Sequence, residues 1–332
     1  MTRITLSKAN FFHNLDIIKE KTKSIQKIAL VLKDNAYGHG LIEMAALAKE
    51  YGISRAVVRS HSEAQKIEEF FEYILVLADT PKVPSKKIRY TINDMQKIKE
   101  FPKGTLVELK VDTGMSRNGI SPKELKEALS SIKEQGLVVE SIFTHHACAD
   151  ELDGKYELQK EQFYKLKERV SQTLKLSFHS SNSAALFRDD TCDEEMVRVG
   201  IAAYGCLELP FASSAEELKP VLSLYADKNS SRVLEEGESV GYGAVFSTRE
   251  KTVVSNYDFG YADGFLRACS QNYTTPEGIE IAGRISMDNS SFVSDKDTLL
   301  IFTDARDVAK FADTISYEVL TALKPHLKRE VV

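Results

Sequence analysis

Charged side chains close several of the apolar runs in the first two thirds of this chain. Lys33 ends one such run inside VLKDNAYGHG, residues 31–40, and four more ionisable residues end other runs. These four are Lys110, His145, His179 and Arg198. A lysine in a desolvating pocket loses its proton more easily, and its neutral amine can form a Schiff base with an aldehyde. An amine, two imidazoles and a guanidinium around one pocket suit an anionic, carbonyl-bearing cofactor better than a metal ion.

Pyridoxal phosphate is an aldehyde of this kind, and it also requires a binding site for its phosphate. Hydroxyl groups and backbone amides can supply such a site. The candidates are the hydroxyl groups of Ser183 and Tyr37 and the amides near Gly200 and Ile201. We expect no metal at His145, because its neighbour His146 points to the opposite face of a strand.

These residues need a scaffold that brings the ends of separate strands together. Short apolar runs alternate with helix-like segments between residues 27 and 198, which predicts a parallel sheet. Eight runs favour an α/β fold with an N-terminal (β/α)8 TIM-like barrel, in which functional groups collect at the carboxyl ends of the strands. A doubly wound open sheet remains an alternative on pattern alone. The runs are Lys27–Leu32, Arg55–Val58, Tyr73–Leu77, Ile88–Ile92, Leu106–Val111, Leu137–Phe143, Leu174–Phe178 and a weak one near Met196–Arg198.

The helix-like segments include Leu41–Lys49, Ser62–Phe71 and Ser121–Gln135, the last with a serine cap followed by proline. Beyond Pro220 the pattern changes to short runs separated by turn residues, which predicts a mainly β domain. These runs are Leu222–Tyr225, Val240–Phe246, Thr252–Tyr257, Gly278–Ile285 and Thr298–Phe302. We therefore expect a barrel domain over residues 1–217 and a C-terminal β domain over residues 218–332, with the connection at residues 210–219.

Composition and charge disfavour several other classes of protein. The net charge is −5, and no run of Lys and Arg interleaves with aromatic residues, so we expect no binding to nucleic acid. No apolar window of about 18 residues is present, so we expect no membrane-spanning segment and a cytoplasmic location. The four cysteines have no CxxC spacing, so neither a disulfide framework nor a zinc site is indicated.

The sequence resembles the alanine racemase family along nearly its whole length and in family order. The motif KDNAYGHG begins at Lys33 and resembles the lysine motif of that family. The other matching segments are KVDTGMSRNG (110–119), THHACAD (144–150), HSSNSAA (179–185), VRVGIAAYG (197–205), GESVGYG (237–243), GYADG (260–264), GRISMD (283–288) and TISYE (314–318). The resemblance implies a pyridoxal-phosphate-dependent isomerase that interconverts L-alanine and D-alanine, supplies D-alanine for peptidoglycan, and forms a homodimer with shared active sites.

The resemblance also implies a two-base mechanism on a pyridoxal-phosphate aldimine. Lys33 corresponds to the lysine that holds the cofactor as an internal aldimine. Tyr242 corresponds to the opposing base, which the β domain of the partner subunit supplies. Arg198 corresponds to the arginine that faces the pyridine nitrogen. Because arginine only donates hydrogen bonds, that nitrogen should stay unprotonated, which weakens the cofactor as an electron sink.

Supporting roles follow from the same resemblance. His145 and His179 match histidines in the hydrogen-bond chain that links this arginine to the tyrosine base. Arg117 matches an arginine that contacts the cofactor phenolic oxygen and the substrate carboxylate, and Lys110 matches a lysine that is often carbamylated. The phosphate-contact positions are Tyr37, Ser183, Gly200, Ile201 and Tyr317. Met287 from the partner chain matches a residue that meets the substrate carboxylate through its backbone, and the entrance positions are Tyr261, Asp288 and Tyr317.

Several positions depart from the family pattern. Asn118 stands where leucine is usual, and His146 stands where phenylalanine is frequent. Neither change removes a reacting group, but three alternatives share much of the scaffold. They are a racemase of serine or of broad specificity, a non-catalytic single-domain pyridoxal-phosphate-binding protein, and an amino-acid decarboxylase. The β domain argues against the second, and Arg198 opposes the third, because such decarboxylases usually place a carboxylate at the pyridine nitrogen.

Overall fold

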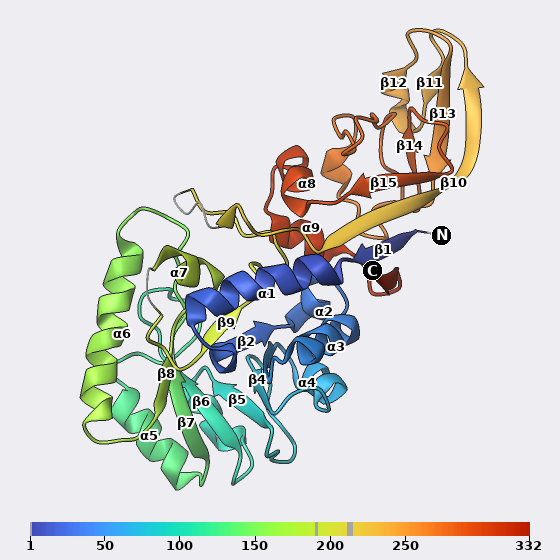
Figure 1. Ribbon diagram of the computed structural model, residues 1–332. Coiled ribbons are helices and arrows are strands. Elements are labelled where there is room, and N and C mark those ends of the chain that lie inside the picture. The colour runs from blue at the N-terminus through green and yellow to red at the C-terminus, as the bar shows by residue number, and fades with distance from the viewer. Residues whose placement is uncertain (1, 190–191, 211–214) are drawn as a thin grey trace.

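An eight-stranded parallel barrel forms the N-terminal part of the chain in the computed structural model (Figure 1). The structure describes residues 2–189, 192–210 and 215–332. The strand order is β8-β7-β6-β5-β4-β3-β2-β9, and the Arg198 amide donates to the Ser181 carbonyl over 3.0 Å beyond β8, which nearly closes the ring. The strands are β2 (Ile28–Val31), β3 (Arg55–Val58), β4 (Tyr73–Val76), β5 (Ile88–Ile92), β6 (Leu106–Lys110), β7 (Val138–Phe143), β8 (Ser177–His179) and β9 (Val197–Val199).

The barrel expected from the sequence is confirmed, and the open-sheet alternative is wrong. Each of the eight apolar runs named between residues 27 and 198 forms a barrel strand, and the ends differ from those expected by three residues at most. The reason is burial: β2 is buried at all four positions, as a strand covered on both faces must be. Because all strands run in parallel, their carboxyl ends, and the charged residues that follow them, lie at one mouth.

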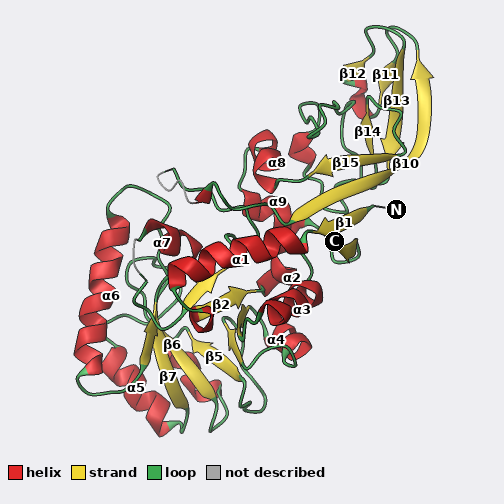
Figure 2. Cartoon of the chain, viewed as in Figure 1, coloured by secondary structure: helices red, strands yellow, loops and turns green. Residues whose placement is uncertain are grey.

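Helices α3 to α6 pack along the outside of the barrel (Figure 2). α3 (Leu41–Tyr51) confirms one expected helix, and α4 (His61–Ile67) ends earlier than expected. The helix expected from Ser121 starts only at α5 (Leu125–Glu134), because the Glu124 amide donates to the Ser121 carbonyl in a preceding turn. The other helices before residue 200 are α1 (Lys8–Thr22), α2 (Lys33–Tyr37), α6 (Lys155–Ser171) and α7 (Ser183–Arg188), with short 3-10 segments at Ile25–Lys27 and Met95–Glu100.

The C-terminal domain is mainly β, as expected, and its sheet includes the first strand of the chain (Figure 1). The sheet order is β14-β13-β10-β1-β16, and β15 also pairs with β10. β1 runs antiparallel to β10 and parallel to β16, so both ends of the chain meet in this sheet. The elements are β1 (Arg3–Leu6), β10 (Leu222–Leu234), β13 (Thr252–Tyr257), β14 (Ser290–Phe292), β15 (Thr298–Phe302), β16 (Lys328–Val331), α8 (Ala305–Ala312) and α9 (Ser316–Ala322).

Two expected strands of this domain are wrong. The run 240–246 is a small hairpin of β11 (Ser239–Val240) and β12 (Phe246–Ser247) around a 3-10 turn at Tyr242–Ala244. Gly241 and Gly243 interrupt the run, because their φ values of +70° and +76° are not strand conformations. The run 278–285 forms only isolated bridges, at positions 280 and 281.

Two further expectations concern a membrane-spanning helix and a metal site. Across residues 2–189, 192–210 and 215–332, no helix is long and apolar enough to cross a membrane. In the same ranges, no group of three His, Cys, Asp or Glu side chains could hold a metal ion. Residues 211–214 of the expected connection lie outside the described residues.

Candidate active site

Lys33 follows β2 at a point where the backbone makes a left-handed turn. Residues 34–37 are four consecutive non-glycine residues with φ between +52° and +56°. Each such residue costs about 1–2 kcal/mol relative to a right-handed conformation, so the surroundings must hold the turn. Glu63 contributes by accepting the Asp34 amide over 2.7 Å. The turn brings Tyr37 back toward the lysine, whose Nζ lies 6.0 Å from the centre of the tyrosine ring.

The Lys33 side chain is half-buried, and its amine is uncommitted. Among the residues that the structure describes, Nζ has neither a hydrogen-bond acceptor nor an ion-pair partner. Shielded polar groups in proteins are usually hydrogen-bonded, so an open amine at a strand end is available to a ligand. This environment fits the amine that the sequence predicts to react with an aldehyde.

A cluster of polar groups lies next to this turn, beyond β9. The Gly200 amide donates to the Ser183 hydroxyl oxygen over 3.1 Å. A Cβ atom at position 200 would lie 2.6 Å from the Tyr37 hydroxyl oxygen, so glycine is required for the tyrosine to stand there. The Ile201 amide has no acceptor within the described chain. Hydroxyl groups and an open amide therefore meet at one point, as an anion-binding site requires.

Tyr317 of α9 lies beside this cluster. Its ring centre lies 5.9 Å from that of Tyr37, and it is 41% exposed. Burial raises the pKa of Tyr37 far above its ordinary value, and Tyr317 adds to that shift. The Tyr37 hydroxyl therefore stays protonated and can donate to an anion.

Arg198 is 5% exposed and gives most of its donors to protein groups. Nη2 donates to the Thr144 carbonyl over 2.7 Å and to the Ser180 carbonyl over 2.9 Å. Nη1 donates to Nδ1 of His179. Nε has no acceptor in the part of the chain that the structure describes. The Nε–H of this firmly held guanidinium thus remains for a ligand atom that can only accept, such as an unprotonated ring nitrogen.

His145 lies on the other side of the guanidinium. Its Nδ1 is 3.5 Å from Nη2 of Arg198, a long contact. Burial lowers the pKa of His145 well below its ordinary value, and the charges of Arg198 and Lys110 act in the same direction. The imidazole is therefore neutral at physiological pH and can accept or pass on a proton.

Lys110 ends β6 and is 9% exposed. Burial lowers its pKa to about 8, and the positive charges of Arg117, Arg198 and Lys33 contribute, while Asp112 opposes them. Arg117 itself is exposed in the loop that follows β6. The barrel mouth therefore gathers four cationic side chains, which favours an anionic ligand.

The remaining predicted site residues lie in the C-terminal domain, apart from those of the barrel. Tyr242 is 70% exposed and stands between β11 and β12, at the end of that domain farthest from the barrel (Figure 1). Met287 is 56% exposed, and its amide has no acceptor among the described residues. Tyr261 is 41% exposed, and its amide donates to Ser286 beside Met287. Asp288 is exposed next to them. One chain does not bring this group to Lys33.

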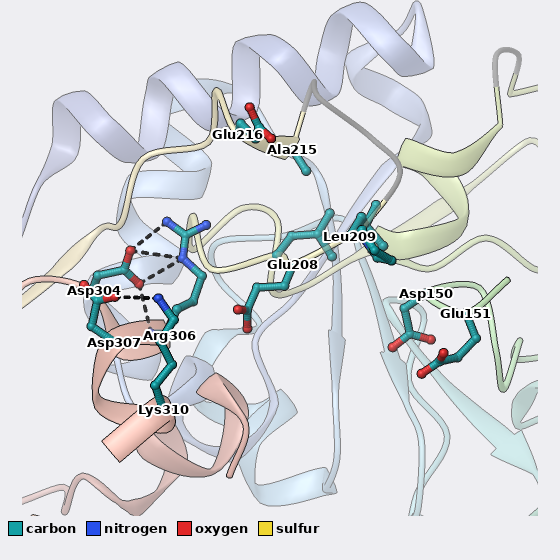
Figure 3. A pocket seen from close by; sticks show the side chains of 12 residues that line it. Asp150, Glu151, Glu208, Leu209, Ala215, Glu216, Asp304, Arg306, Asp307 and Lys310 are labelled. Carbon is teal, nitrogen blue, oxygen red and sulfur yellow. Dashed lines mark hydrogen bonds and ion pairs between the residues drawn. The ribbon is translucent and has the colours of Figure 1, made fainter. Parts of the chain in front are cut away.

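A cavity of about 660 Å³ between the barrel loops and α8 lies outside this site (Figure 3). Arg306 pairs with Asp304 over 2.7 Å, and Lys310 pairs with Asp307 over 2.9 Å. Both lining cations are thus neutralised, and four more carboxylates make the cavity acidic, so it repels a phosphate or a carboxylate. These carboxylates belong to Asp150, Glu151, Glu208 and Glu216.

Sequence reasoning missed a buried carboxylate beside the predicted site. Glu108 lies inside β6 and is 1% exposed. Its Oε2 accepts from Nε2 of His179 over 2.8 Å, and its Oε1 accepts from the Tyr73 hydroxyl. A glutamate within the apolar run LVELK was the available signal, since a charged residue in a buried strand needs a partner.

His146, at a position where the family often has phenylalanine, lowers the stability of the folded protein. It is 2% exposed, and neither ring nitrogen has a hydrogen-bond partner in the described residues. Burial lowers the pKa of His146 to about 4. Below about pH 6.5 the unfolded chain therefore takes up a proton that the native protein does not, and stability falls until about pH 4.

We therefore expect His146→Phe to raise the free energy of unfolding by about 1–3 kcal/mol at pH 7, because two unpaired polar atoms disappear. The gain should be larger at pH 5, where the unfolded wild type also gains a proton. Denaturant titrations at both pH values measure it. Lys126→Phe, at an exposed position of α5 with no side-chain partner in the described residues, is the control and should change stability by less than about 0.5 kcal/mol. An equal or lower stability of His146→Phe would contradict this explanation.

A nearly closed parallel barrel with an open amine at its mouth, joined to a mainly β domain, places the chain in a class of two-domain barrel proteins. Two family models match the chain: "Alanine racemase, N-terminal domain" over residues 6–208, and "Alanine racemase, C-terminal domain" over residues 221–331. The chain belongs to the alanine racemase family. It is an isomerase that interconverts L-alanine and D-alanine (EC 5.1.1.1). The C-terminal match decides against a single-domain, non-catalytic protein.

Full-length relatives agree with this assignment. The alanine racemase of a Nitratiruptor species is 42% identical over 335 residues, which cover 99% of each chain. That of Campylobacter jejuni subsp. jejuni is 40% identical over 100% of both. Among solved structures, Clostridium difficile 630 alanine racemase superimposes with a TM-score of 0.91 at 27% identity, covering 100% of this chain and 95% of that one. Bacillus anthracis alanine racemase with bound L-Ala-P superimposes with a TM-score of 0.87 at 27% sequence identity, also covering 100% of this chain and 95% of that one.

Proposed function

We propose that Lys33 and Tyr242 are the two bases of alanine racemisation, and that they come from different subunits of a homodimer. Racemisation requires proton removal on one face of the α-carbon and proton return on the other. One observation supports the assignment above all. The Lys33 amine is open at the barrel mouth, whereas Tyr242 of the same chain is 70% exposed at the end of the C-terminal domain farthest from the barrel. A second copy can complete the site that one copy leaves divided.

The surface around Tyr242 supports the homodimer. Val245 is 37% exposed and Met287 is 56% exposed on the same domain. A cavity of about 670 Å³ opens beside the tyrosine, with Arg284 and Asn289 in its walls. Tyr242 lines this cavity and is therefore open to contact from a second subunit. The partner barrel, with its cationic mouth, is the surface that this face receives.

Pyridoxal phosphate is the cofactor we propose for the barrel mouth. When bound, it serves as the electron sink for the charge that the departing α-proton leaves behind. The residues fit it: Lys33 offers an open amine for its aldehyde, and Arg198 offers its free Nε–H for the ring nitrogen. The phosphate is held by the groups assigned from the sequence. These are Tyr37, Ser183, Gly200, Ile201 and Tyr317.

The remaining residues bind and limit the substrate. Arg117 and the open amide of Met287 from the partner chain hold the substrate carboxylate, which fixes the α-hydrogen toward one of the two bases. Neutral His145 links Arg198 to the tyrosine base. Tyr261, Asp288 and Tyr317 narrow the entrance, so a methyl side chain is favoured over longer ones. We propose that the D-alanine product serves peptidoglycan synthesis.

Racemisation in deuterated water tests this function. L-Alanine should yield both enantiomers, and both should carry deuterium at the α-carbon, because each base exchanges its proton with solvent. Removing the cofactor with hydroxylamine should abolish the reaction, and adding pyridoxal phosphate should restore it. Inverted product that retains its original α-hydrogen, or activity that survives cofactor removal, would contradict the proposal.

Lys110 is expected to carry a carbamate. Its pKa of about 8 leaves much of the amine neutral at slightly alkaline pH, and the neutral form reacts with carbon dioxide. A carbamate changes the charge from positive to negative, so Lys110 attracts Arg117 instead of repelling it. In carbon-13 bicarbonate, NMR should show a carbamate signal that grows from pH 7 to pH 9 and is lost in Lys110→Gln. Lys97→Gln, a matched exposed lysine, should keep it. No signal at pH 9 would contradict the expectation.

A further inference from the structure

Glu108 has a defined set of partners deep in the barrel. His179 donates from Nε2 over 2.8 Å, and Tyr73 donates from its hydroxyl. The Ser141 hydroxyl oxygen lies 3.1 Å from the same Nε2. Burial raises the pKa of Glu108, but its contacts with His179, Tyr73 and Ser141 bring it below its ordinary value. The carboxylate is therefore ionised although it is only 1% exposed.

Arg198 determines which nitrogen of His179 carries the proton. A guanidinium only donates, so Nδ1 of His179 must offer a lone pair to Nη1. The proton then sits on Nε2 and is donated to Glu108. The ring is held in plane by Phe143, whose ring is stacked on it at 4.8 Å and 9°. A cation, a neutral imidazole and an anion thus form one buried chain of hydrogen bonds.

The other carboxylate near Arg198 cannot take this role. Glu194 accepts from the amides of Ser180 and Ser181, both over 2.8 Å, and from the Ser180 hydroxyl. Its oxygens hold the chain beyond β8 and form no hydrogen bond or ion pair with the guanidinium in the described residues, although the charge of Glu194 acts on Arg198. Among the carboxylates that the structure describes, Glu108 reaches Arg198 through a shared side chain, His179, and Glu194 does not.

We propose that Glu108 is a positioning residue for the racemisation. Glu108 accepts a hydrogen bond from Nε2–H of His179, so the Nδ1 lone pair of His179 stays directed at Arg198. Arg198 is thereby held with its free Nε–H directed at the cofactor ring nitrogen. This rests on the proposed function, in which Arg198 contacts that nitrogen. The opposite tautomer would put an N–H of His179 against Nη1 and push the guanidinium out of line. Glu108 transfers no proton in the reaction.

Two substitutions separate the charge from the hydrogen bond. Glu108→Gln keeps the size but leaves one acceptor oxygen for two donors, so its amide N–H groups face either His179 or Tyr73. Glu108→Leu removes both acceptor oxygens. In Glu108→Gln, the Kd for pyridoxal phosphate should rise about tenfold and kcat should fall at least about tenfold, with KM for alanine nearly unchanged. KM is spared because Arg117 and Met287 hold the substrate carboxylate. If Glu108→Leu does not fold, Glu108→Gln carries the test. Glu140→Gln, at a half-exposed position on β7, is the control and should behave as wild type.

A double-mutant cycle tests whether Glu108 acts through His179. The double variant Glu108→Gln, His179→Gln should bind pyridoxal phosphate no more weakly than His179→Gln alone, because the path to Arg198 is already cut. Nitrogen-15 NMR of histidine-labelled, cofactor-free wild type should show His179 protonated on Nε2 alone. Additive losses, wild-type affinity in Glu108→Gln, or a proton on Nδ1 would each overturn the inference.

Borohydride reduction distinguishes this inference from the proposed function. In wild type it should fix the cofactor on the peptide that contains Lys33. If the label is on Lys33 and Glu108→Gln still matches wild type in Kd and kcat, the inference alone is wrong. If no label is found on Lys33, the proposed function is wrong and the inference falls with it.

Discussion

Lys33→Ala is expected to reduce alanine racemisation by at least about 10³-fold, because the variant loses both a covalent anchor and a positioned base, and a base alone contributes about 10²–10⁴-fold. Racemisation is followed by polarimetry or by coupled assays in both directions. Borohydride should no longer fix the cofactor to the protein. The fold should survive, because the amine has no acceptor or ion-pair partner in the described residues.

A matched lysine controls for the loss of charge. Lys126 is exposed on α5 and has no side-chain partner in the described residues, so Lys126→Ala should keep full activity and the borohydride label. Lys33→Ala with near-normal turnover, or with the label moved to another lysine, would show that the cofactor amine has been assigned to the wrong residue.

Tyr242→Phe is expected to reduce racemisation by about 10²–10⁴-fold, the usual contribution of a positioned acid or base. The substitution removes one oxygen from a side chain that is 70% exposed in the single chain, so stability should change little. Tyr164→Phe, at an exposed position on α6, is the control and should have no effect.

Tyr242→Phe should also separate the two faces of the substrate. Lys33 remains, so the enantiomer whose α-hydrogen faces it should still exchange that hydrogen for deuterium without inversion. The other enantiomer should lose both exchange and inversion. Equal loss of exchange from both enantiomers would mean that the tyrosine does not serve one face alone.

The barrel could be predicted from the sequence because its strands are buried on both faces. Apolar runs such as RAVV at residues 55–58 stand out against the polar helices between them. The strand at residues 3–6 could not be predicted from the sequence, because its partner strands are more than 200 positions away. Arg3 pairs with Tyr225 and with Lys328. The run 240–246 misled for a local reason, because two glycines turn the backbone inside it.

The residues of the barrel mouth could be predicted because each follows an apolar run, and in a parallel barrel the carboxyl ends of the strands meet. Which side chains support them does not follow from that rule. Glu108 lies within a strand, and its contact with His179 depends on the spacing of β6 and β8. Arg329, near the C-terminus, donates from Nε and Nη2 to the Gly38 carbonyl beside the strained turn after Lys33. Such contacts could not be predicted, because nothing in the local sequence pattern specifies the partner residue.

Subunit complementation tests most directly whether each active site takes Lys33 from one chain and Tyr242 from the other. The Lys33→Ala and Tyr242→Phe chains are coexpressed with different tags, and hybrid dimers are isolated through both tags. Each hybrid contains one site with both residues intact and one site with neither, so two inactive parents should yield about half of the wild-type activity per dimer. Hybrid dimers that form but stay as inactive as their parents would contradict the shared site.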